Sequence, residues 1–358
     1  MSSHFYPLTI RDIRKETPEC ISIAFDIPSH LSDLFQFQQG QHINLKADIN
    51  GSEVRRSYSI CSAPYEKELR IAVKQQFNGL FSDFANTHLQ KGDTLEVMPP
   101  RGKFFTPLNP SSKKNYLAIA AGSGITPVLS IIKETLLQEP QSEFTLIYGN
   151  RSRKSVIFFE ELEAIKNKYI NRFTLIHILS REKTDVSLNF GRIDEAKLND
   201  LAGLIDYTTI DAFFVCGPEG LIFCAKEFLE AKGIDSKKIH FELFGTKPKA
   251  KQQHNSPAVA SSSPSSHITV QLDGRSFSFD IPFSSDTTIL DAAAQQGADV
   301  PYSCKGGVCC TCKAKLLEGE VTMDVHWGLE EEEIQQGYIL TCQSHPKTEK
   351  IVVDFDVK

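Results

Sequence analysis

The hydrophobic and polar positions of this chain follow three different patterns along its length. Between residues 5 and 105, short runs of alternating apolar and polar residues recur with Gly, Pro or Asn between them: LTIRDIRKE, CISIAFDI, HINLKADI, RRSYSICS, ELRIAVKQ and DTLEVMPP. Alternation with period two is typical of strands that bury one face. Closely spaced strands of this kind predict an antiparallel β-barrel or sandwich, which we assign to residues 1–108.

After Asn115 the pattern changes to strands that alternate with helices. Near-continuous apolar runs such as YLAIAAG and FTLIHILS predict buried strands, whereas TPVLSIIKETLLQ and PEGLIFCAKEFLEAKG have the apolar spacing of amphipathic helices. This alternation predicts an α/β domain with a parallel sheet over residues 109–245.

A third pattern begins after a segment of very different composition, residues 246–267 (TKPKAKQQHNSPAVASSSPSSH). The segment has no aromatic residue, so it cannot bury enough apolar surface to offset the entropy of ordering, and we expect a flexible linker. Strands HITVQLD, RSFSFDI and KIVVDFDV then surround helical patterns at TILDAAAQQG and LEEEEIQQG. Residues 268–358 are therefore predicted to form a small α+β domain.

The composition is that of an ordinary globular protein, with 41% hydrophobic and 23% charged residues. No apolar run is long enough for a membrane span, and the start, MSSHFYPLTI, lacks the features of a signal peptide. Nine cysteines are present, five of them between residues 304 and 342. An odd number with this clustering argues against a disulfide framework and favours a reducing compartment, so we expect a cytoplasmic protein.

Charge is concentrated in the tail. Residues 268–358 contain 15 Asp and Glu against 7 Lys and Arg, a net of −8, which leaves +2 on the rest of a chain whose total is −6. An acidic tail argues against nucleic-acid binding and favours a protein partner that is guided by electrostatics. The alternative is that these acidic residues, including Glu330–Glu333, form a solvated surface that only increases solubility.

The cysteine loop has a specific spacing, C-x4-C-x2-C-x29-C, formed by Cys304, Cys309, Cys312 and Cys342. This is the spacing of plant-type [2Fe–2S] clusters. Zinc sites favour two short ligand pairs, of which only one is present here, and disulfides do not suit the expected compartment. Cys310 lies between two of these ligands, and we interpret it as a spare thiol.

A glycine turn follows the first buried strand of the α/β domain, in AAGSGITPVLS. Gly122, Ser123 and Gly124 end the strand, and Thr126 with Pro127 opens the next helix. Such a turn lets backbone N–H groups meet a phosphate. By itself it is equally compatible with a tight structural turn, and it is not the six-residue glycine fingerprint of dinucleotide-binding folds.

Four further motifs occur with this turn in a fixed order: RSYS at 56–59, GLFS at 79–82, VCGPEG at 215–220 and FELFG at 241–245. In combination they resemble the ferredoxin–NADP reductase family over residues 5–245. That resemblance implies an FAD-binding barrel followed by an NAD(P)-binding domain. The tail resembles plant-type ferredoxins, which implies a β-grasp fold around the cluster.

The resemblance also implies roles for individual residues at the flavin. Arg56 would neutralise its pyrophosphate, Tyr58 would lie against its ring, and Ser59 would hydrogen-bond near the N5 atom that accepts hydride. The helix that opens at Gly79 would direct its N-terminus at the phosphate. The other flavin-binding residues implied are Ser57, Leu80, Ser82, Glu242 and Phe244.

At the nicotinamide, the resemblance implies that Cys216 lies beside the ring, with Gly217 and Pro218 shaping the turn around it. Ser59, Cys216 and Glu242 would be the catalytic residues. Ser180 and Arg181, with Arg151 nearby, would bind a 2′-phosphate and so favour NADPH; NADH would favour an acidic residue there. The segment PPRGKFF at 99–105 resembles that of FAD-type members.

A flavin accepts hydride as an electron pair and releases electrons singly, so this domain order implies a relay from NADPH through FAD and the [2Fe–2S] cluster to a protein acceptor. GYILTCQSHP, the linker and AGSGITP most resemble reductases that serve multisubunit di-iron oxygenases in phenylacetate degradation, which epoxidise phenylacetyl-CoA. Other acceptors remain open: a desaturase, a ring-hydroxylating dioxygenase or a hybrid-cluster protein. Phthalate-dioxygenase-type reductases share the order but use FMN and NADH. A redox-sensing module is the alternative of another class.

Overall fold

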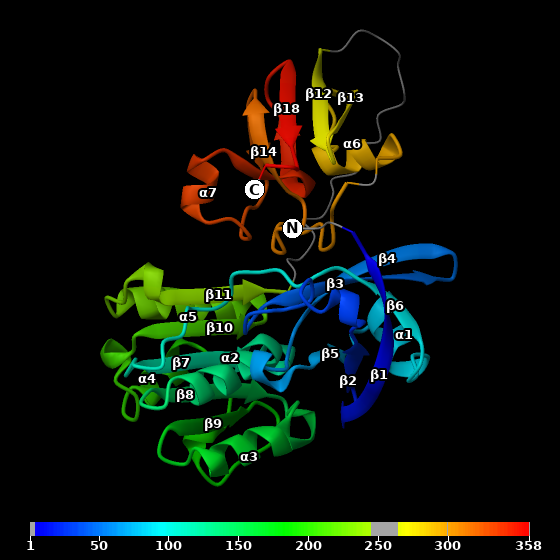
Figure 1. Ribbon diagram of the computed structural model, residues 1–358. Coiled ribbons are helices and arrows are strands. Elements are labelled where there is room, and N and C mark those ends of the chain that lie inside the picture. The colour runs from blue at the N-terminus through cyan, green and yellow to red at the C-terminus, as the bar shows by residue number, and fades with distance from the viewer. Residues whose placement is uncertain (1–3, 245–263, 299, 358) are drawn as a thin grey trace. The chain divides into compact units, whose positions relative to one another are not determined.

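The computed structural model describes residues 4–244, 264–298 and 300–357. The chain divides into two compact units, Met1–Phe244 and Gly245–Lys358, which are described separately (Figure 1). Most of the predicted linker, 246–267, lies outside the described residues. Its last four residues do not, and strand β12 already begins at Ser265.

Within residues 4–244, the first six strands form one antiparallel sheet in the order β4-β3-β6-β1-β2-β5. A bridge between Ile60, just after β4, and Ile71 within β5 joins the two edges of the sheet and closes it into a barrel, which confirms the predicted class. Helix α1 (Leu80–Thr87) follows the fifth strand. The strands are Tyr6–Thr17 (β1), Cys20–Asp26 (β2), His42–Ile49 (β3), Ser52–Ser59 (β4), Leu69–Lys74 (β5) and Thr94–Val97 (β6).

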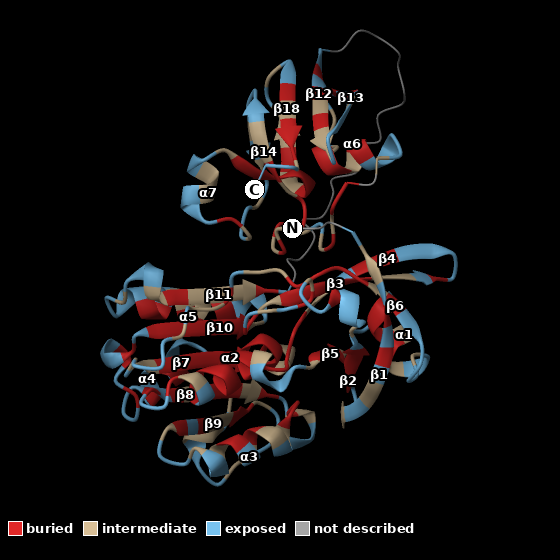
Figure 2. Ribbon diagram, in the orientation of Figure 1, coloured by how far each residue is buried: buried red, intermediate tan, exposed pale blue. Residues whose placement is uncertain are grey.

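Residues 115–243 form the predicted parallel sheet, with strand order β11-β10-β7-β8-β9. The strands are Asn115–Ala121 (β7), Glu143–Asn150 (β8), Phe173–Leu179 (β9), Ala212–Gly217 (β10) and Ile239–Leu243 (β11). The helices between them are Ile125–Gln138 (α2), Phe159–Lys168 (α3), Glu195–Leu201 (α4) and Glu219–Ala231 (α5). Figure 2 shows β7, β10 and α2 almost wholly buried.

The strand order reverses between β7 and β10. From β7 the chain moves outward on one side to β8 and β9, and then returns to β10 on the other side. In open α/β sheets, ligands bind at the carboxyl ends of the two strands that flank such a switch point. Here those ends carry the glycine turn at 122–124 and Cys216, so the topology places both predicted motifs at one crevice.

Helix α2 also fixes the barrel against the α/β sheet. Its buried Lys133 pairs with Glu66 of the barrel at 2.6 Å and with Glu161 of α3 at 2.8 Å. Burial acts to lower the pKa of Lys133, but the two carboxylates outweigh it and raise the pKa, so the amine stays charged. One turn earlier, Ser130 donates a hydrogen bond to the carbonyl of Ser62 at 2.7 Å.

In the second unit, residues 264–298 and 300–357 form a mixed five-stranded sheet in the order β13-β12-β18-β14-β16, with a small second sheet, β15-β17. A core of aliphatic side chains lies between the larger sheet and helix α6. The elements are Ser265–Leu272 (β12), Arg275–Pro282 (β13), Ile289–Gln295 (α6), Lys313–Glu318 (β14), Val321–Met323 (β15), Glu331–Gln335 (α7), Tyr338–Leu340 (β16), Ser344–Pro346 (β17) and Lys350–Asp354 (β18).

None of the helices in the described ranges has the length and hydropathy that crossing a bilayer requires.

Replacing Ile119 by alanine tests the packing of the central strand. Ile119 on β7 is fully buried, so Ile119→Ala is expected to lower the free energy of unfolding by about 2–5 kcal/mol, through lost burial and the cavity left behind. Ile170→Ala is the matched control because that side chain is 71% exposed. Urea unfolding followed by far-UV circular dichroism measures both; equal midpoints for the two variants would contradict this packing.

Candidate functional site

A pocket of about 400 Å³ lies where the barrel meets the carboxyl edge of the parallel sheet. It brings together nine residues predicted from sequence, from β4, the start of α1, the glycine turn, the start of α2 and the end of β11: Arg56, Ser57, Tyr58, Ser59, Gly79, Ser82, Ser123, Thr126 and Phe244. It also has four lining residues that the sequence interpretation missed: Ala72, Lys74, Gln76 and Phe81. Ala72 and Lys74 follow the period-two alternation of β5, and Gln76 continues it two residues beyond the strand. This alternation is the signal that would have identified them.

A hydrogen bond joins the two halves of this first unit beside the pocket. Ser59 Oγ donates to Glu242 Oε2 at 2.9 Å, although the two residues are 183 positions apart. Each of them is in register with another residue on its neighbouring strand: Ser59 with His42, and Glu242 with Cys216. The barrel and the α/β sheet therefore each contribute one cross-strand pair to a single cluster.

His42 is a member of this cluster that the sequence interpretation did not single out. Its Nδ1 lies 3.7 Å from Glu242 Oε1, and its side chain is only 8% exposed. The imidazole and Ser59 thus contact different oxygens of one carboxylate and hold it in place. Only the register of β3 against β4 reveals this, because His42 is distant in sequence from both partners.

Cys216 is completely buried at the carboxyl end of β10. Burial raises the pKa of its thiol well above the usual range, and the nearby Glu242 carboxylate raises it further. The side chain is therefore a neutral thiol at physiological pH. It can offer contact and shape to a ring bound at the strand end, rather than act as a thiolate nucleophile.

Tyr58 provides an aromatic surface in the pocket. Its ring packs against Phe81 of α1 with centroids 5.5 Å apart, and burial raises the pKa of its hydroxyl. The phenol is therefore neutral. Arg56 lies two residues earlier on the same strand face, with an exposed guanidinium whose Nη1 also donates to the carbonyl of Arg55 at 2.7 Å.

The start of α1 is organised by Ser82. Its Oγ accepts from the backbone N–H of Gln76 at 3.0 Å and donates to the carbonyl of Gly79 at 3.1 Å. Helix α1 begins at Leu80 with Gly79 as its N-cap, as predicted, so its first N–H groups border the pocket. Leu80 itself is 44% exposed and does not line the pocket.

The glycines of the turn after β7 serve the chain's own packing. A Cβ atom at Gly124 would lie 2.1 Å from the carbonyl oxygen of Cys216, so only glycine lets this turn approach β10. Gly122 has φ +55°, a left-handed conformation that favours glycine, and a Cβ there would lie 3.6 Å from Lys74 Nζ. At the end of β10, a Cβ at Gly217 would meet Leu221 at 3.0 Å, and Pro218 then caps α5.

The residues predicted to select the nucleotide lie together at the next two strand ends. The backbone N–H of Arg181 donates to the carbonyl of Arg151 at 2.8 Å, and that of Ser180 to the carbonyl of Asn150 at 2.9 Å. Both arginine side chains are exposed. They do not line the 400 Å³ pocket, so they form a separate cationic edge on the same side of the sheet.

The donor set of the pocket fits a flavin nucleotide. An aromatic ring face, an exposed guanidinium, a lysine amine and a helix N-terminus match a planar ring system that carries an anionic phosphate. When bound there, a flavin supplies a site that takes hydride and returns single electrons. Tyr58 would hold its ring and Arg56 its phosphate, while Ser59 and Glu242 would stand at the edge where a proton is exchanged.

In the second unit, the four predicted cysteine ligands form two pairs. The thiol of Cys304 is hydrogen-bonded with that of Cys309, and this bond, followed by burial, raises its pKa. The thiol of Cys312 is likewise hydrogen-bonded with Cys342; that bond raises the pKa of Cys312 and lowers that of Cys342. Across the described part of the chain, no group of three or more His, Cys, Asp and Glu is arranged around a single ion. Two pairs fit two irons better than one zinc.

Backbone geometry around the cysteines also fits a cluster. The N–H of Gly306 donates to Cys304 Sγ at 3.3 Å, and the backbone of Gly307 hydrogen-bonds to Cys342. Gly307 has φ +73°, and a Cβ there would lie 2.7 Å from Val325, so the loop needs glycine to close over the sulfurs. All nine cysteines lie in the described ranges and are free thiols.

Cys310 is directed elsewhere. Its Sγ donates to the carbonyl of Gly328, and its backbone is left-handed, with φ +53°. The contact with Gly328 supports the interpretation of Cys310 as a spare thiol.

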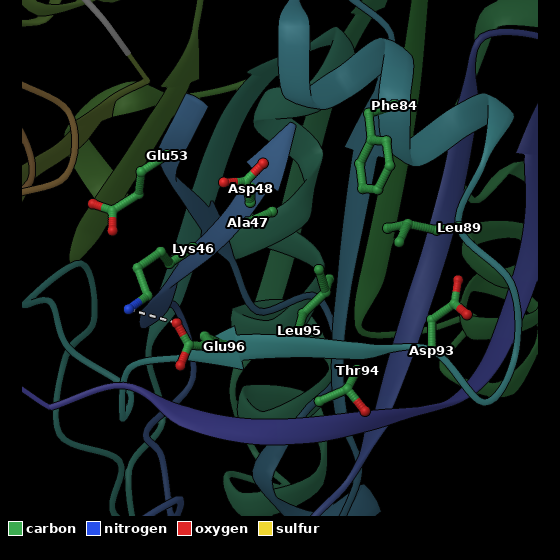
Figure 3. Close-up of a pocket in the computed structure, with 10 residues that line it drawn as sticks. All are labelled: Lys46, Ala47, Asp48, Glu53, Phe84, Leu89, Asp93, Thr94, Leu95 and Glu96. Carbon is green, nitrogen blue, oxygen red and sulfur yellow. Dashed lines mark ion pairs between the residues drawn. The ribbon is translucent and has the colours of Figure 1, made fainter. Parts of the chain in front are cut away.

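A second hollow, of about 420 Å³, is lined by residues of β3, β4, α1 and β6 (Figure 3). Leu95, Phe84 and Leu89 provide apolar contacts, and Lys46 pairs with Glu96 at 2.5 Å at its rim. None of the residues predicted for chemistry lines it. We therefore assign the reaction to the pocket at the barrel and sheet junction.

Serine substitution of two adjacent cysteines tests the ligand set. Cys309→Ser is expected to lose the reddish-brown iron–sulfur absorbance after anaerobic reconstitution, because a required thiolate is missing. Cys310→Ser is its matched control and is expected to retain both the absorbance and the iron content. Iron and sulfide analysis with visible spectroscopy measures both, and the reverse pattern would overturn the assignment.

Three protein-family models match successive parts of the chain. Residues 7–106 match the oxidoreductase FAD-binding domain, residues 118–227 the oxidoreductase NAD-binding domain, and residues 270–347 the 2Fe-2S iron-sulfur cluster binding domain. The three matches follow one another in the order that the sequence patterns predicted.

Whole-chain relatives have the same organisation. The chain is 44% identical to one of the subunits of 1,2-phenylacetyl-CoA epoxidase of Escherichia coli, over 99% of this chain and 98% of that protein. It is 35% identical to the ferredoxin reductase component of 3-ketosteroid-9-alpha-monooxygenase of Rhodococcus rhodochrous, covering 97% and 96%. Among solved structures, phthalate dioxygenase reductase matches with a TM-score of 0.61 and 27% identity, covering 98% of each chain. The chain therefore belongs to the family of oxidoreductases that combine an FAD-binding barrel, an NAD-binding α/β domain and a [2Fe–2S] domain in one polypeptide.

Proposed function

We propose that this chain is the NADPH-oxidising reductase component of a multisubunit di-iron oxygenase that epoxidises phenylacetyl-CoA. The observation that carries this proposal is the 44% identity, along the whole chain, to a component of phenylacetyl-CoA epoxidase. Its domains would be residues 1–108 for FAD, 109–245 for the nicotinamide nucleotide and 268–358 for the cluster, with 246–267 as the tether. The free cysteines favour work in a reducing compartment such as the cytoplasm.

The residues at the switch point would position the two rings for hydride delivery. Cys216 and the turn at Gly217 would place a nicotinamide ring at the end of β10, next to the flavin pocket. Ser59 would exchange a proton at the flavin edge. Its hydroxyl donates a hydrogen bond to Glu242 Oε2 at 2.9 Å, which would orient it. Holding the two reacting rings in one fixed geometry is the main contribution that the protein makes to the rate.

The cationic edge at the ends of β8 and β9 supports a preference for NADPH. Arg151 and Arg181 are exposed there and held together through a backbone hydrogen bond, and both guanidinium groups suit a phosphate dianion. The neighbouring acidic residue, Glu182, accepts from the backbone N–H of Arg153 at 2.9 Å. One oxygen of its carboxylate is thus engaged with the loop.

The cluster domain would be the outlet for single electrons. Cys304 and Cys309 would hold one iron, and Cys312 and Cys342 the other. Residues 268–358 carry a net charge of −8, which would attract the basic surface of an acceptor and orient it. Tethering this domain to the reductase unit would keep the flavin and cluster at a high effective concentration, set by the length of the tether.

A second candidate acceptor has its own support. Relatives named as reductase components of 3-ketosteroid-9-alpha-monooxygenase and of glycine betaine monooxygenase match this chain at 35% and 30% identity. The reductase chemistry would be identical in each case. Only the surface that the acceptor contacts would differ.

Removing one arginine tests the nucleotide preference. Arg181→Gln is expected to lower kcat/KM for NADPH by about tenfold or more, the usual effect of losing a charge-assisted hydrogen bond, and to leave NADH unchanged. Arg14→Gln on the barrel is the matched control because its side chain is 61% exposed. Steady-state ferricyanide reduction with each nucleotide measures this; a wild-type preference for NADH would refute the assignment.

Reconstitution with candidate oxygenases tests the acceptor. With the oxygenase component of a phenylacetyl-CoA epoxidase, NADPH oxidation is expected to depend on phenylacetyl-CoA and to match epoxide formation. A ketosteroid monooxygenase component with its steroid is the comparison, and slower coupled turnover is expected there. Faster coupled turnover with the steroid system, at equal rates of cytochrome c reduction, would contradict the proposed partner and leave the relay itself intact.

A further inference from the structure

The hollow drawn in Figure 3 has no part in the chemistry assigned to the flavin pocket. It has a volume of about 420 Å³, and its lining comes from β3, β4, α1 with the loop that follows it, and β6. All of these elements belong to the reductase unit, Met1–Phe244. Its shape is therefore a property of that unit alone.

The floor of the hollow is apolar. Leu95 of β6 is buried, and Phe84 of α1 and Leu89 just after α1 are half-buried. Phe84 and Leu89 pack against the barrel core with part of their surface and line the hollow with another part. Figure 3 shows these two side chains on one side of the hollow and the ion pair of Lys46 with Glu96 on the other. An apolar surface with a polar rim is a common feature of sites that contact another protein.

The rim of the hollow is acidic. Four of the five charged residues that line it are carboxylates: Asp48, Glu53, Asp93 and Glu96. Lys46, the fifth, pairs with Glu96 at 2.5 Å, and Arg55, outside the lining, pairs with Glu53 at 2.8 Å. The two carboxylates that are left, those of Asp48 and Asp93, give the rim its negative charge.

Backbone hydrogen bonds hold these two carboxylates in place. Asp48 Oδ1 accepts from the N–H of Gly51 at 2.8 Å, and Asp93 Oδ2 accepts from the N–H of Gln90 at 2.8 Å. Within the described ranges, neither carboxylate forms an ion pair with a lysine, arginine or histidine. A backbone N–H orients a carboxylate without cancelling its charge, so two fixed negative charges remain beside the apolar floor.

We propose that the hollow is a docking site for a cationic segment of the acceptor protein, in which a lysine or arginine stands next to a large apolar side chain. The apolar side chain would cover Leu95, Phe84 and Leu89, and the cation would pair with the carboxylates of the rim. A purely apolar segment would leave Asp48 and Asp93 without water or a partner, which is costly. A segment with cations only would leave the floor uncovered.

This inference rests on the proposed function, because the occupant is taken to be the oxygenase component that receives the electrons. The cluster domain, with a net charge of −8, would attract the same kind of basic surface. One acidic contact on each unit would keep the acceptor bound to the reductase unit while the cluster domain delivers electrons. Binding at two places raises the effective concentration of acceptor at the cluster.

The test measures the affinity of full-length holoprotein for the oxygenase component of a phenylacetyl-CoA epoxidase, by biolayer interferometry. The double variant Asp48→Asn/Asp93→Asn is expected to raise the Kd about threefold to thirtyfold at low ionic strength, because two attractive charges are lost. The difference from wild type is expected to vanish in about 1 M salt, where charges are screened within about 3 Å. Ferricyanide reduction by NADPH is expected to be the same in both proteins.

A second variant fills the hollow without changing its charge. Thr94 lines the hollow from an exposed position on β6, so the indole of Thr94→Trp would occupy part of the space. This variant is expected to raise the Kd about tenfold or more, and the loss is expected to persist in high salt because it is steric. Unchanged affinity in Thr94→Trp would overturn the proposal, since the partner would then contact charges on the surface and not the hollow.

Asp206→Asn/Asp235→Asn is the matched control. These two aspartates are exposed and also accept a backbone N–H, from Thr208 and Lys237, but they lie in the α/β domain. The control is expected to bind as the wild type does. An equal loss in the control and in the rim variant would overturn the proposal, because net charge would then explain both.

The remaining outcomes separate this inference from the function on which it rests. Unchanged affinity in the rim variant of a chain that binds the oxygenase would overturn the docking site alone. A wild-type chain that does not bind this oxygenase would overturn the proposed function together with the docking site. Sedimentation that finds a wild-type dimer and a monomeric Thr94→Trp would assign the hollow to a second copy of the chain and likewise contradict the proposal.

Discussion

The hydrogen bond between Ser59 and Glu242 is the contact on which the arrangement of the reductase unit depends. It joins the last residue of β4 in the barrel to β11 in the parallel sheet, at 2.9 Å. Cross-strand neighbours on each side, His42 and Cys216, complete the cluster at this junction. The ion pairs of Lys133 with Glu66 of the barrel and Glu161 of α3 join the same two halves at a second place. Together these contacts fix the position of the pocket relative to the end of β10. Hydride transfer between two bound rings requires such a fixed relation, because small displacements of reacting atoms slow a reaction severely.

The second unit is shaped by a different requirement, the transfer of electrons one at a time. An electron pair must be divided before it reaches an acceptor that takes one electron at a time, and the cysteine loop supplies the place for the divided electrons. Three of its paired cysteines and the glycine at 307 lie in one loop, and the fourth cysteine, Cys342, comes from the turn after β16.

Sequence patterns predicted the parts of this protein whose causes are local. Alternation of period two identified the barrel strands. Cysteine spacing singled out four candidate ligands, which form two hydrogen-bonded pairs while Cys310 contacts Gly328. The partner of Ser59 was beyond such reasoning, because Glu242 is 183 residues away and only the meeting of two sheets brings them together. His42 was missed for the same reason. Gly124 shows the opposite case: its residue type was noticed, but the close approach of the Cys216 carbonyl is visible only in the folded chain. Composition alone also extended the linker to 267, whereas pairing with β13 and β18 starts β12 at Ser265.

The most direct test of an electron path contained in one chain is anaerobic stopped-flow spectroscopy of the holoprotein mixed with NADPH. The flavin absorbance is expected to fall first and the iron–sulfur absorbance second, with a rate for the second phase that does not change with protein concentration. Such a rate identifies transfer within one molecule. A second phase that accelerates in proportion to protein concentration, or a cluster that is never reduced while the flavin is, would contradict the account.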